Sequence, residues 1–245
     1  MNICDGIGIN RTNEDMLSVL MIGQSNMCGR GNLHEVPQIE NPACYMMRMG
    51  RWQPMSDPIN VDRAIEGIPY PSGVSLAGSF ADELSRYTGK DVGLIPCADG
   101  GTKVESWLPG KLLFDHAVMQ CRLAMRTSTL AGIIWHQGES NAHTDPALYK
   151  KRVRTVFEGL RRELGIPDLP IVAGEISENC APKWEISKTA DKINAVYYEL
   201  EKELPNLAIA SSKGLTLKDD GIHFSSVSLR EFGIRYFKKF ITIYK

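Results

Sequence analysis

Short apolar segments alternate with longer amphipathic segments along this chain, and that alternation restricts its fold more than any other feature. The apolar segments fit strands buried on both faces, and they cover residues 17–23, 45–49, 92–96, 132–135, 169–173 and 207–210. The amphipathic segments carry apolar residues at helical spacing, and they cover residues 75–87, 111–125, 145–164, 187–204 and 227–240. Strands and helices in alternation predict a parallel sheet covered by helices on both faces.

The length and the charge of the chain indicate how many domains it has and which kinds of partner it is not expected to bind. The chain has 245 residues, 43% of them hydrophobic and 23% charged, and its formal net charge is -1. The even spread of apolar segments predicts a single domain over residues 1–245. Without an excess of basic residues, the chain is not expected to bind nucleic acid. No apolar run approaches the roughly 20 residues that span a bilayer, so no membrane segment is expected, and no feature predicts an oligomeric state.

The N-terminus and the cysteines both indicate a cytoplasmic protein. Residues 1–15 contain three acidic residues and lack a basic start followed by an apolar run, so they do not resemble a signal peptide. The six cysteines are scattered, without a Cys-x-x-Cys pair. Buried free thiols in a reducing compartment are therefore expected, and secretion is the alternative if a leader has been removed.

Three polar segments that contain glycine follow three of the predicted strands. They are Gly23 to Asn26, Ala98 to Thr102 and His136 to Ser140. In an open parallel sheet, ligands bind outside the C-terminal ends of the strands. These segments are therefore expected to converge on one site.

Ser25 is the first candidate for chemistry, because it lies at a predicted junction of strand and helix. A serine there can expose its hydroxyl group while nearby backbone N–H groups face a substrate. The alternative is a serine that only caps the helix. Since Met27 occupies the last position of the pattern Gly-x-Ser-x-Gly, the nucleophile motif of the α/β-hydrolases is missing.

A second candidate is the sequence Asp220-Gly-Ile-His223. At this spacing the carboxylate can contact Nδ1 of the imidazole and leave Nε2 free to accept a proton from a serine. A solvated turn without catalytic function is the alternative, and Asp219 can compete with Asp220 for the imidazole.

Donors for an oxyanion are also present in the other two segments. The backbone N–H groups of Gly100, Gly101 and Thr102 and the side-chain amide of Gln137 can surround a developing negative charge together with the N–H of Ser25. A simple turn explains the glycines equally. Asn26, Trp52 and Trp107 are candidates for a substrate pocket, since an aromatic side chain beside polar groups suits a sugar, or else for packing.

The histidines and acidic residues do not predict a metal site. His116, His136, Glu139, His143 and Asp145 lie near one another in the sequence, but no recognised ligand spacing relates them. No metal and no organic cofactor are expected.

The order of four motifs along the chain is distinctive. Gly-Gln-Ser-Asn-Met at residues 23–27 is followed by Gly-Gly-Thr at 100–102, Trp-His-Gln-Gly-Glu-Ser at 135–140 and Asp-Gly-Ile-His at 220–223. This order resembles the SGNH (GDSL-like) hydrolases, specifically the branch of sialate O-acetylesterases and acetylxylan esterases (carbohydrate esterase family 6). The resemblance extends from about residue 17 to the last predicted helix.

The resemblance implies a flavodoxin-like, three-layer α/β/α sandwich with a five-stranded parallel sheet. It implies that Ser25 is the nucleophile, His223 the general base and Asp220 the residue that orients it. Ser25 and Gly101 are then expected to line the oxyanion hole, with Gly100 as the alternative glycine. The broad superfamily uses an asparagine as a third donor, and Gln137 takes that place here. The expected substrate pocket is formed by Gln24, Asn26, Gly100, Thr102, Trp107 and Glu139.

The function that the resemblance implies is removal of O-acetyl groups from carbohydrates through an acyl-enzyme. Acetylated xylo-oligosaccharides and sialic acids both fit this chemistry. Two other classes compete with it: a catalytically silent carbohydrate-binding protein of the same fold, and a metal-dependent hydrolase.

Overall fold

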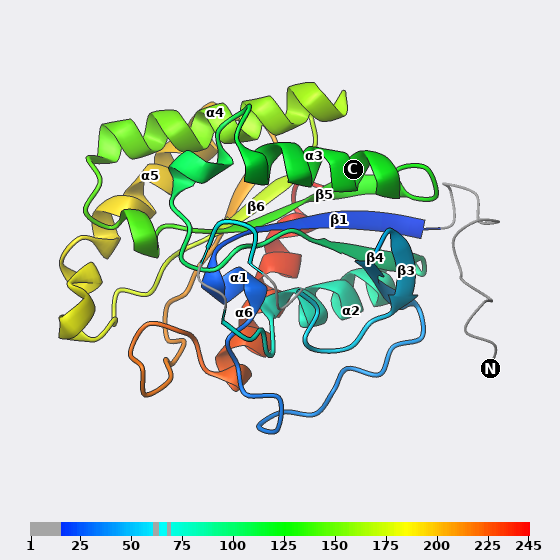
Figure 1. The fold of residues 1–245 in the computed structure, drawn as a ribbon, viewed down its shortest axis with the longest axis horizontal. Coiled ribbons are helices and arrows are strands. Elements are labelled where there is room, and N and C mark those ends of the chain that lie inside the picture. Colours follow the sequence, from blue (N-terminus) through cyan, green and yellow to red (C-terminus); the bar gives the residue numbers. More distant parts are fainter. Residues whose placement is uncertain (1–15, 61–63, 68–69) are drawn as a thin grey trace.

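A central sheet separates two layers of helices in the computed structural model, which describes residues 16–60, 64–67 and 70–245 (Figure 1). The helices α3, α4 and α5 cover one face of the sheet, and α2 and α6 cover the other. This arrangement confirms the predicted α/β fold with helices on both faces. The expectations about a leader and about Cys4 concern residues 1–15, which lie outside the described residues.

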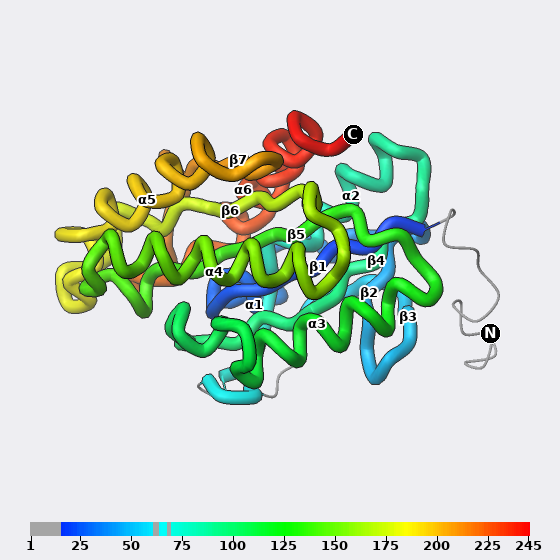
Figure 2. Tube along the Cα trace, turned by 90° about the horizontal axis from the view of Figure 1, so that it is seen from above, coloured from blue at the N-terminus to red at the C-terminus, as the bar shows by residue number. Residues whose placement is uncertain are grey.

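The sheet has seven strands instead of the five that the resemblance implies, in the order β3-β2-β4-β1-β5-β6-β7 (Figure 2). Their bounds are β1 (Met16–Gly23), β2 (Cys44–Arg48), β3 (Arg51–Pro54), β4 (Asp91–Pro96), β5 (Thr129–His136), β6 (Ile171–Gly174) and β7 (Leu207–Ala210). Every neighbouring pair is parallel except β2 and β3. The turn at residues 49–50 folds β3 back onto β2 as an antiparallel edge, so the sheet is mixed.

The helices follow the predicted segments closely. They are α1 (Ser25–Cys28), α2 (Leu76–Thr88), α3 (Leu112–Ala124), α4 (Pro146–Leu164), α5 (Ala190–Glu203) and α6 (Ser226–Phe240). Side-chain caps fix three starts: Ser75 accepts a hydrogen bond from the N–H of Ala77, Asp145 accepts one from the N–H of Leu148, and Ser225 accepts one from the N–H of Ser228. The predicted helix at 187–204 begins only at Ala190, because Thr189 has a non-helical backbone (φ -137).

The central strand β1 explains how the two layers are joined. Its side chains alternate between two apolar cores, one on each face of the sheet. Met16, Leu20 and Ile22 pack toward α3, α4 and α5, whereas Leu17, Val19 and Met21 pack toward α2 and α6. A strand buried on both faces is rigid, and it holds the segment that follows it in a fixed position. Among the described residues, no helix is both long and apolar enough to cross a membrane.

Candidate active site

The three polar segments expected to converge do so at the C-terminal ends of β1, β4 and β5. The N–H of Gln24 donates to the carbonyl of His136 at 2.8 Å, and the N–H of Asp99 donates to the carbonyl of Gly23 at 2.9 Å. Gly23 has a φ of +128°, and a Cβ there would stand 2.0 Å from the carbonyl oxygen of His136. Only glycine permits this approach. The turn after β1 is therefore held directly against the end of β5.

Ser25, His223 and Asp220 form one hydrogen-bonded chain. The Oγ atom of Ser25 lies 3.0 Å from Nε2 of His223, and Nδ1 of His223 lies 2.9 Å from Oδ2 of Asp220. Asp219 is exposed and is not the residue in contact with the imidazole. The structure thus brings together the three residues that the sequence singled out, from opposite ends of the chain.

The carboxylate of Asp220 is held in place by its own loop. Its Oδ1 atom accepts hydrogen bonds from the N–H groups of Ile222 at 3.0 Å and His223 at 2.9 Å. Partial burial raises the pKa of Asp220, but these backbone hydrogen bonds and the contact with the imidazole outweigh burial and lower it below its ordinary value. Asp220 is therefore ionised at neutral pH and favours the imidazole tautomer with its proton on Nδ1.

A buried polar chain links Ser25's neighbour to the histidine loop. Nδ2 of Asn26 donates to Oε1 of Glu139 at 2.6 Å, and Oδ1 of Asn26 accepts from the N–H of Phe224 at 3.0 Å. Nε2 of His136 lies 3.2 Å from the same oxygen of Glu139. Burial raises the pKa of Glu139, but His136 and the hydrogen bonds outweigh it and lower the pKa overall. Asn26 and Glu139 thus support the site and do not line an open pocket.

Free backbone donors lie next to the serine hydroxyl. Within the described part of the chain, the N–H groups of Ser25 and Gly101 have no hydrogen-bond acceptor. A Cβ at Gly100 would stand 3.8 Å from Cβ of Ser25 and 2.4 Å from Nη2 of Arg30. The glycines therefore let the loop after β4 approach the serine closely.

The side-chain amide of Gln137, expected to be an oxyanion donor, is hydrogen-bonded within the protein, and its role in the oxyanion hole stays a prediction. It is fully buried, and its Nε2 atom is directed at protein acceptors: Oδ1 of Asn141 at 2.7 Å, the carbonyl of Thr102 at 3.3 Å and Oε1 of Gln24 at 3.2 Å. An amide nitrogen has only two hydrogens. Both are therefore used within the protein.

The side-chain amide of Gln24 has the reverse arrangement, because its oxygen atom and not its nitrogen atom is hydrogen-bonded to the protein. Its Oε1 atom accepts hydrogen bonds from the backbone N–H groups of Gly138 at 3.4 Å and Ser140 at 3.2 Å, as well as from Gln137. Because backbone N–H groups can only donate, these contacts identify the oxygen end of the side chain. Among the described residues, the Nε2 atom of Gln24 has no acceptor, so a donor adjacent to Ser25 is unused.

The tryptophans proposed for a pocket are buried. Trp107 is 1% exposed, and its Nε1 atom donates to Oγ1 of Thr102 at 3.2 Å. Thr102 is also buried, and its hydroxyl donates to the carbonyl of Asp99. Trp52 packs over Gly93 at the β3 edge of the sheet. Apolar packing decided these positions, and neither ring can form a surface for a sugar.

The buried cation Arg30 lies near Ser25, and no pattern in the sequence indicated it. Arg30 is 6% exposed, its Nη1 atom donates to the carbonyl of Gly29 at 2.9 Å, and its guanidinium lies 5.5 Å from the centre of the Tyr70 ring. No ion pair joins it to a carboxylate in the described residues. A positive charge in this position favours negative charge on a group bound at Ser25.

An open cleft of about 570 Å³ borders the glycine loop, lined by Glu66, Gly67, Gly101, Thr102, Lys103, Glu105 and Ser106. One wall is fixed by Asp99, whose Oδ2 atom accepts hydrogen bonds from the N–H groups of residues 65–67 at 2.7–3.0 Å. The cleft therefore gives a substrate access to Gly101.

A hydrolase site can also use a metal ion, which needs several ligands close together. Across residues 16–60, 64–67 and 70–245, no three residues among His, Cys, Asp and Glu gather as metal ligands. The expectation that no metal is needed stays a prediction.

Cys28, Cys44, Cys97, Cys121 and Cys180 are buried and free, which confirms the predicted buried thiols at these positions. Burial raises the pKa of Cys28 to about 12, so its thiol is protonated at neutral pH.

Solved structures with this fold include esterases. A protein of Arabidopsis thaliana, AT4G34215, superposes with a TM-score of 0.81 at 23% identity over 94% of this chain and 99% of that chain. NanS superposes with a TM-score of 0.74 at 16% identity over 94% and 98%. XAC1771, described as a carbohydrate acetylesterase from Xanthomonas citri, superposes with a TM-score of 0.58 at 17% identity over 94% of this chain and 56% of that one. These likenesses establish the fold.

The sequence comparisons establish the family. The probable carbohydrate esterase At4g34215 of Arabidopsis thaliana is 26% identical over 236 residues, which are 88% of this chain and 86% of that protein. Residues 16–242 match the family described as "Carbohydrate esterase, sialic acid-specific acetylesterase". The chain therefore belongs to this family of carbohydrate esterases and is an esterase.

Proposed function

We propose that this protein removes O-acetyl groups from carbohydrates, with Ser25 as nucleophile, His223 as general base and Asp220 as the residue that orients His223. The observation that carries the proposal is the continuous chain from Oγ of Ser25 through the imidazole to Asp220, with contacts of 3.0 and 2.9 Å. A nucleophile, a base and a third group that orients the base are the parts that acyl transfer requires.

In the first step, Oγ of Ser25 attacks the acetyl carbonyl carbon while Nε2 of His223 accepts the hydroxyl proton. The tetrahedral intermediate then collapses, the bond to the sugar oxygen breaks, and His223 donates the proton to that oxygen. In the second step, His223 accepts a proton from water as the water oxygen attacks the carbonyl carbon of the acetyl-serine. The bond from that carbon to Oγ of Ser25 then breaks, acetate leaves, and His223 returns the proton to Oγ. Asp220 stabilises the imidazolium that forms in both steps.

The oxyanion of each intermediate is bound by the N–H groups of Ser25 and Gly101 and by Nε2 of Gln24. Gln24 replaces Gln137 in this role, because its amide hydrogens are unused whereas those of Gln137 are directed at protein acceptors. Donors that are fixed before the reaction stabilise the developing charge without reorganisation. Oε1 of Gln24 is fixed by Gly138 and Ser140.

The acyl group is proposed to be acetyl and the alcohol a sugar hydroxyl. The family description names a sialic acid-specific acetylesterase, and XAC1771 is described as a carbohydrate acetylesterase. Acetylated sialic acids follow from the family description, and acetylated xylo-oligosaccharides remain the alternative that the motif resemblance implies, so these two substrate classes are compared.

The test is acetate release from a panel of defined esters: an acetylated sialic acid, an acetylated xylo-oligosaccharide and an aryl acetate. The proposal predicts release from at least one sugar ester by the wild type and loss of that activity in Ser25→Ala and His223→Ala. A protein that binds sugars without hydrolysing any of them contradicts the proposal and supports a silent binding protein. Activity that survives Ser25→Ala but not a chelator supports a metal-dependent hydrolase.

A further inference from the structure

Trp184 differs from the other tryptophans of the chain in its exposure. The chain has four tryptophans, and Trp52, Trp107 and Trp135 are buried at 4%, 1% and 0% exposure. Trp184 is 42% exposed. Large aromatic side chains are usually removed from water because their burial contributes strongly to stability. Trp184 is therefore the tryptophan of this chain whose ring is most accessible to a ligand.

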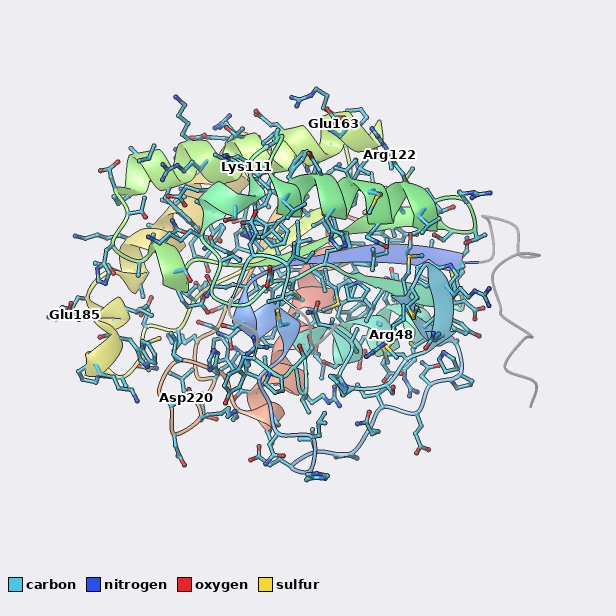
Figure 3. The ribbon with its side chains drawn as sticks, in the orientation of Figure 1. Arg48, Lys111, Arg122, Glu163, Glu185 and Asp220 are labelled. Carbon is cyan, nitrogen blue, oxygen red and sulfur yellow. The ribbon has the colours of Figure 1, made fainter. Side chains whose placement is uncertain are left out.

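The position of Trp184 connects it to the catalytic loop. It ends the short 3-10 helix Pro182–Trp184, in the segment that follows the C-terminal end of β6. Its Nε1 atom donates to the carbonyl of Asp220 at 2.8 Å, and the N–H of Ala181 donates to the carbonyl of Gly221 at 2.7 Å. Figure 3 shows the neighbouring Glu185 and Asp220 at the same end of the molecule.

The indole ring is anchored on one side and accessible on another. The hydrogen bond at Nε1 satisfies the polar group of the side chain and fixes the orientation of the ring. The ammonium group of Lys183 lies 5.6 Å from the ring centre, and the side chain keeps its 42% exposure with that lysine in place. A ring that is already ordered loses little conformational entropy when a ligand packs against it.

We propose that Trp184 forms a binding subsite for a sugar ring of an oligosaccharide whose acetyl group lies at Ser25. This inference rests on the proposed function. The C–H face of a pyranose is apolar and packs on an aromatic ring, while its hydroxyl groups reach water and Lys183. Because the indole of Trp184 contacts the backbone carbonyl of Asp220, and no hydrogen bond joins it to Ser25, we place at Trp184 a ring other than the one that carries the ester.

The test compares three esters: an acetylated oligosaccharide, its acetylated monosaccharide and an aryl acetate. Trp184→Ala is expected to raise KM for the oligosaccharide about tenfold, the factor that corresponds to 1.4 kcal/mol. This rise is expected to be confined to the oligosaccharide, with KM for the two small esters unchanged. Trp184→Phe keeps a ring and retains most of the affinity. The exposed Tyr87, at the end of α2 that precedes β4, provides the control Tyr87→Ala.

A purely structural role for Trp184 gives a different pattern. If the ring only supports the Asp220 loop, Trp184→Ala and Trp184→Phe, which both lose the hydrogen bond to Asp220, change kcat for all three esters, and KM for the oligosaccharide rises no more than KM for the small esters. That result overturns the subsite. Equal KM values of wild type and Trp184→Ala for the oligosaccharide also overturn it.

Binding without turnover separates this inference from the proposed function. In Ser25→Ala, titration with the acetylated oligosaccharide is expected to change tryptophan emission, and the change disappears in the double variant Ser25→Ala/Trp184→Phe. An oligosaccharide that the wild type deacetylates, but that leaves the emission of Ser25→Ala unchanged at saturation, contradicts the subsite and leaves the esterase intact. If the wild type releases no acetate from any sugar ester, the proposed function itself fails.

Discussion

Nδ2 of Asn26 donates a hydrogen bond to Oε1 of Glu139 over 2.6 Å, between residues that are both buried and 113 positions apart. This contact joins the segment after β1 to the segment after β5. Through Oδ1, Asn26 also holds the N–H of Phe224, the residue that follows His223. Ser25 and His223 are therefore held at hydrogen-bond distance by a support that touches neither reacting atom.

This support predicts coupled effects of substitution. Asn26→Ala and Glu139→Ala each break the same link, so each should lower kcat, and the double variant should lower it little further. Residues in one hydrogen-bond network commonly show interaction energies of about 0.5–3 kcal/mol. The check is a double-mutant cycle on kcat and on the free energy of unfolding. Strictly additive effects would show that the two side chains act independently.

Gln24→Glu separates the oxyanion donor from its structural role. Glutamate keeps the shape of the side chain and an oxygen for Gly138 and Ser140, but an ionised carboxylate cannot donate. Loss of one oxyanion donor costs about 2.7–4 kcal/mol, so kcat should fall roughly 10²–10³-fold. Thermal unfolding checks that the variant is folded. A kcat within a factor of two of the wild-type value in the folded variant removes Gln24 from the oxyanion hole.

Gln137→Ala should act mainly on stability. It deprives the hydroxyl of Tyr149 of an acceptor at 2.8 Å and Asn141 of a donor at 2.7 Å. Tyr149 keeps the backbone carbonyl of residue 137 as an acceptor, and Asn141 keeps the N–H of Val104 as a donor. Each lost hydrogen bond therefore costs about 0.5–1.5 kcal/mol, and denaturant unfolding should shift to lower concentration. At temperatures where the variant is folded, its kcat should fall less than that of Gln24→Glu. A larger fall in kcat with unchanged stability restores Gln137 as the oxyanion donor.

Asp220 predicts a pH dependence of stability with a definite sign. Its folded pKa is lowered, so its ionised form contributes to stability above the unfolded value of about 3.9, and the contribution disappears as pH falls through the folded pKa. The difference in Tm between wild type and Asp220→Asn should be constant above about pH 5 and shrink below it. A difference that grows as the pH falls contradicts the assigned contacts.

Thiol reagents should leave activity intact. Cys28 lies three positions after Ser25, and burial raises its pKa to about 12, so its thiol is protonated at pH 8. In a Cys4→Ser background, iodoacetamide should label the chain only after denaturation, and the treated native enzyme should keep its activity. Labelling of native Cys28 with loss of activity would instead favour a cysteine nucleophile.

The sequence predicted the α/β class, the helices on both faces and the meeting of the site segments, because hydrophobic periodicity and the geometry of parallel strands act over whole elements. It did not predict seven strands or the antiparallel edge strand β3. Ser25, Asp220 and His223 came together because each lies at a strand end or in a loop beside one. Side-chain direction depends on atomic packing, which no local pattern encodes, and for this reason Gln137 and Trp107 were assigned to the site but are buried.

The missed residues have two different explanations. Trp184 also lies in a segment that follows a strand, since residues 175–184 come directly after β6. That segment contains no glycine, which was the feature that marked the other three segments. The orientation of the Gln24 amide could not be predicted, because it depends on donors from Gly138 and Ser140 more than a hundred positions away.

Covalent labelling tests the central claim most directly. The native enzyme is treated with a fluorophosphonate, and the modified residue is identified by mass spectrometry of its peptides. The account predicts stoichiometric labelling of Ser25, loss of esterase activity in proportion to labelling, and no labelling in Ser25→Ala or after denaturation. Modification of a different serine, or full activity of an enzyme labelled at Ser25, would contradict it.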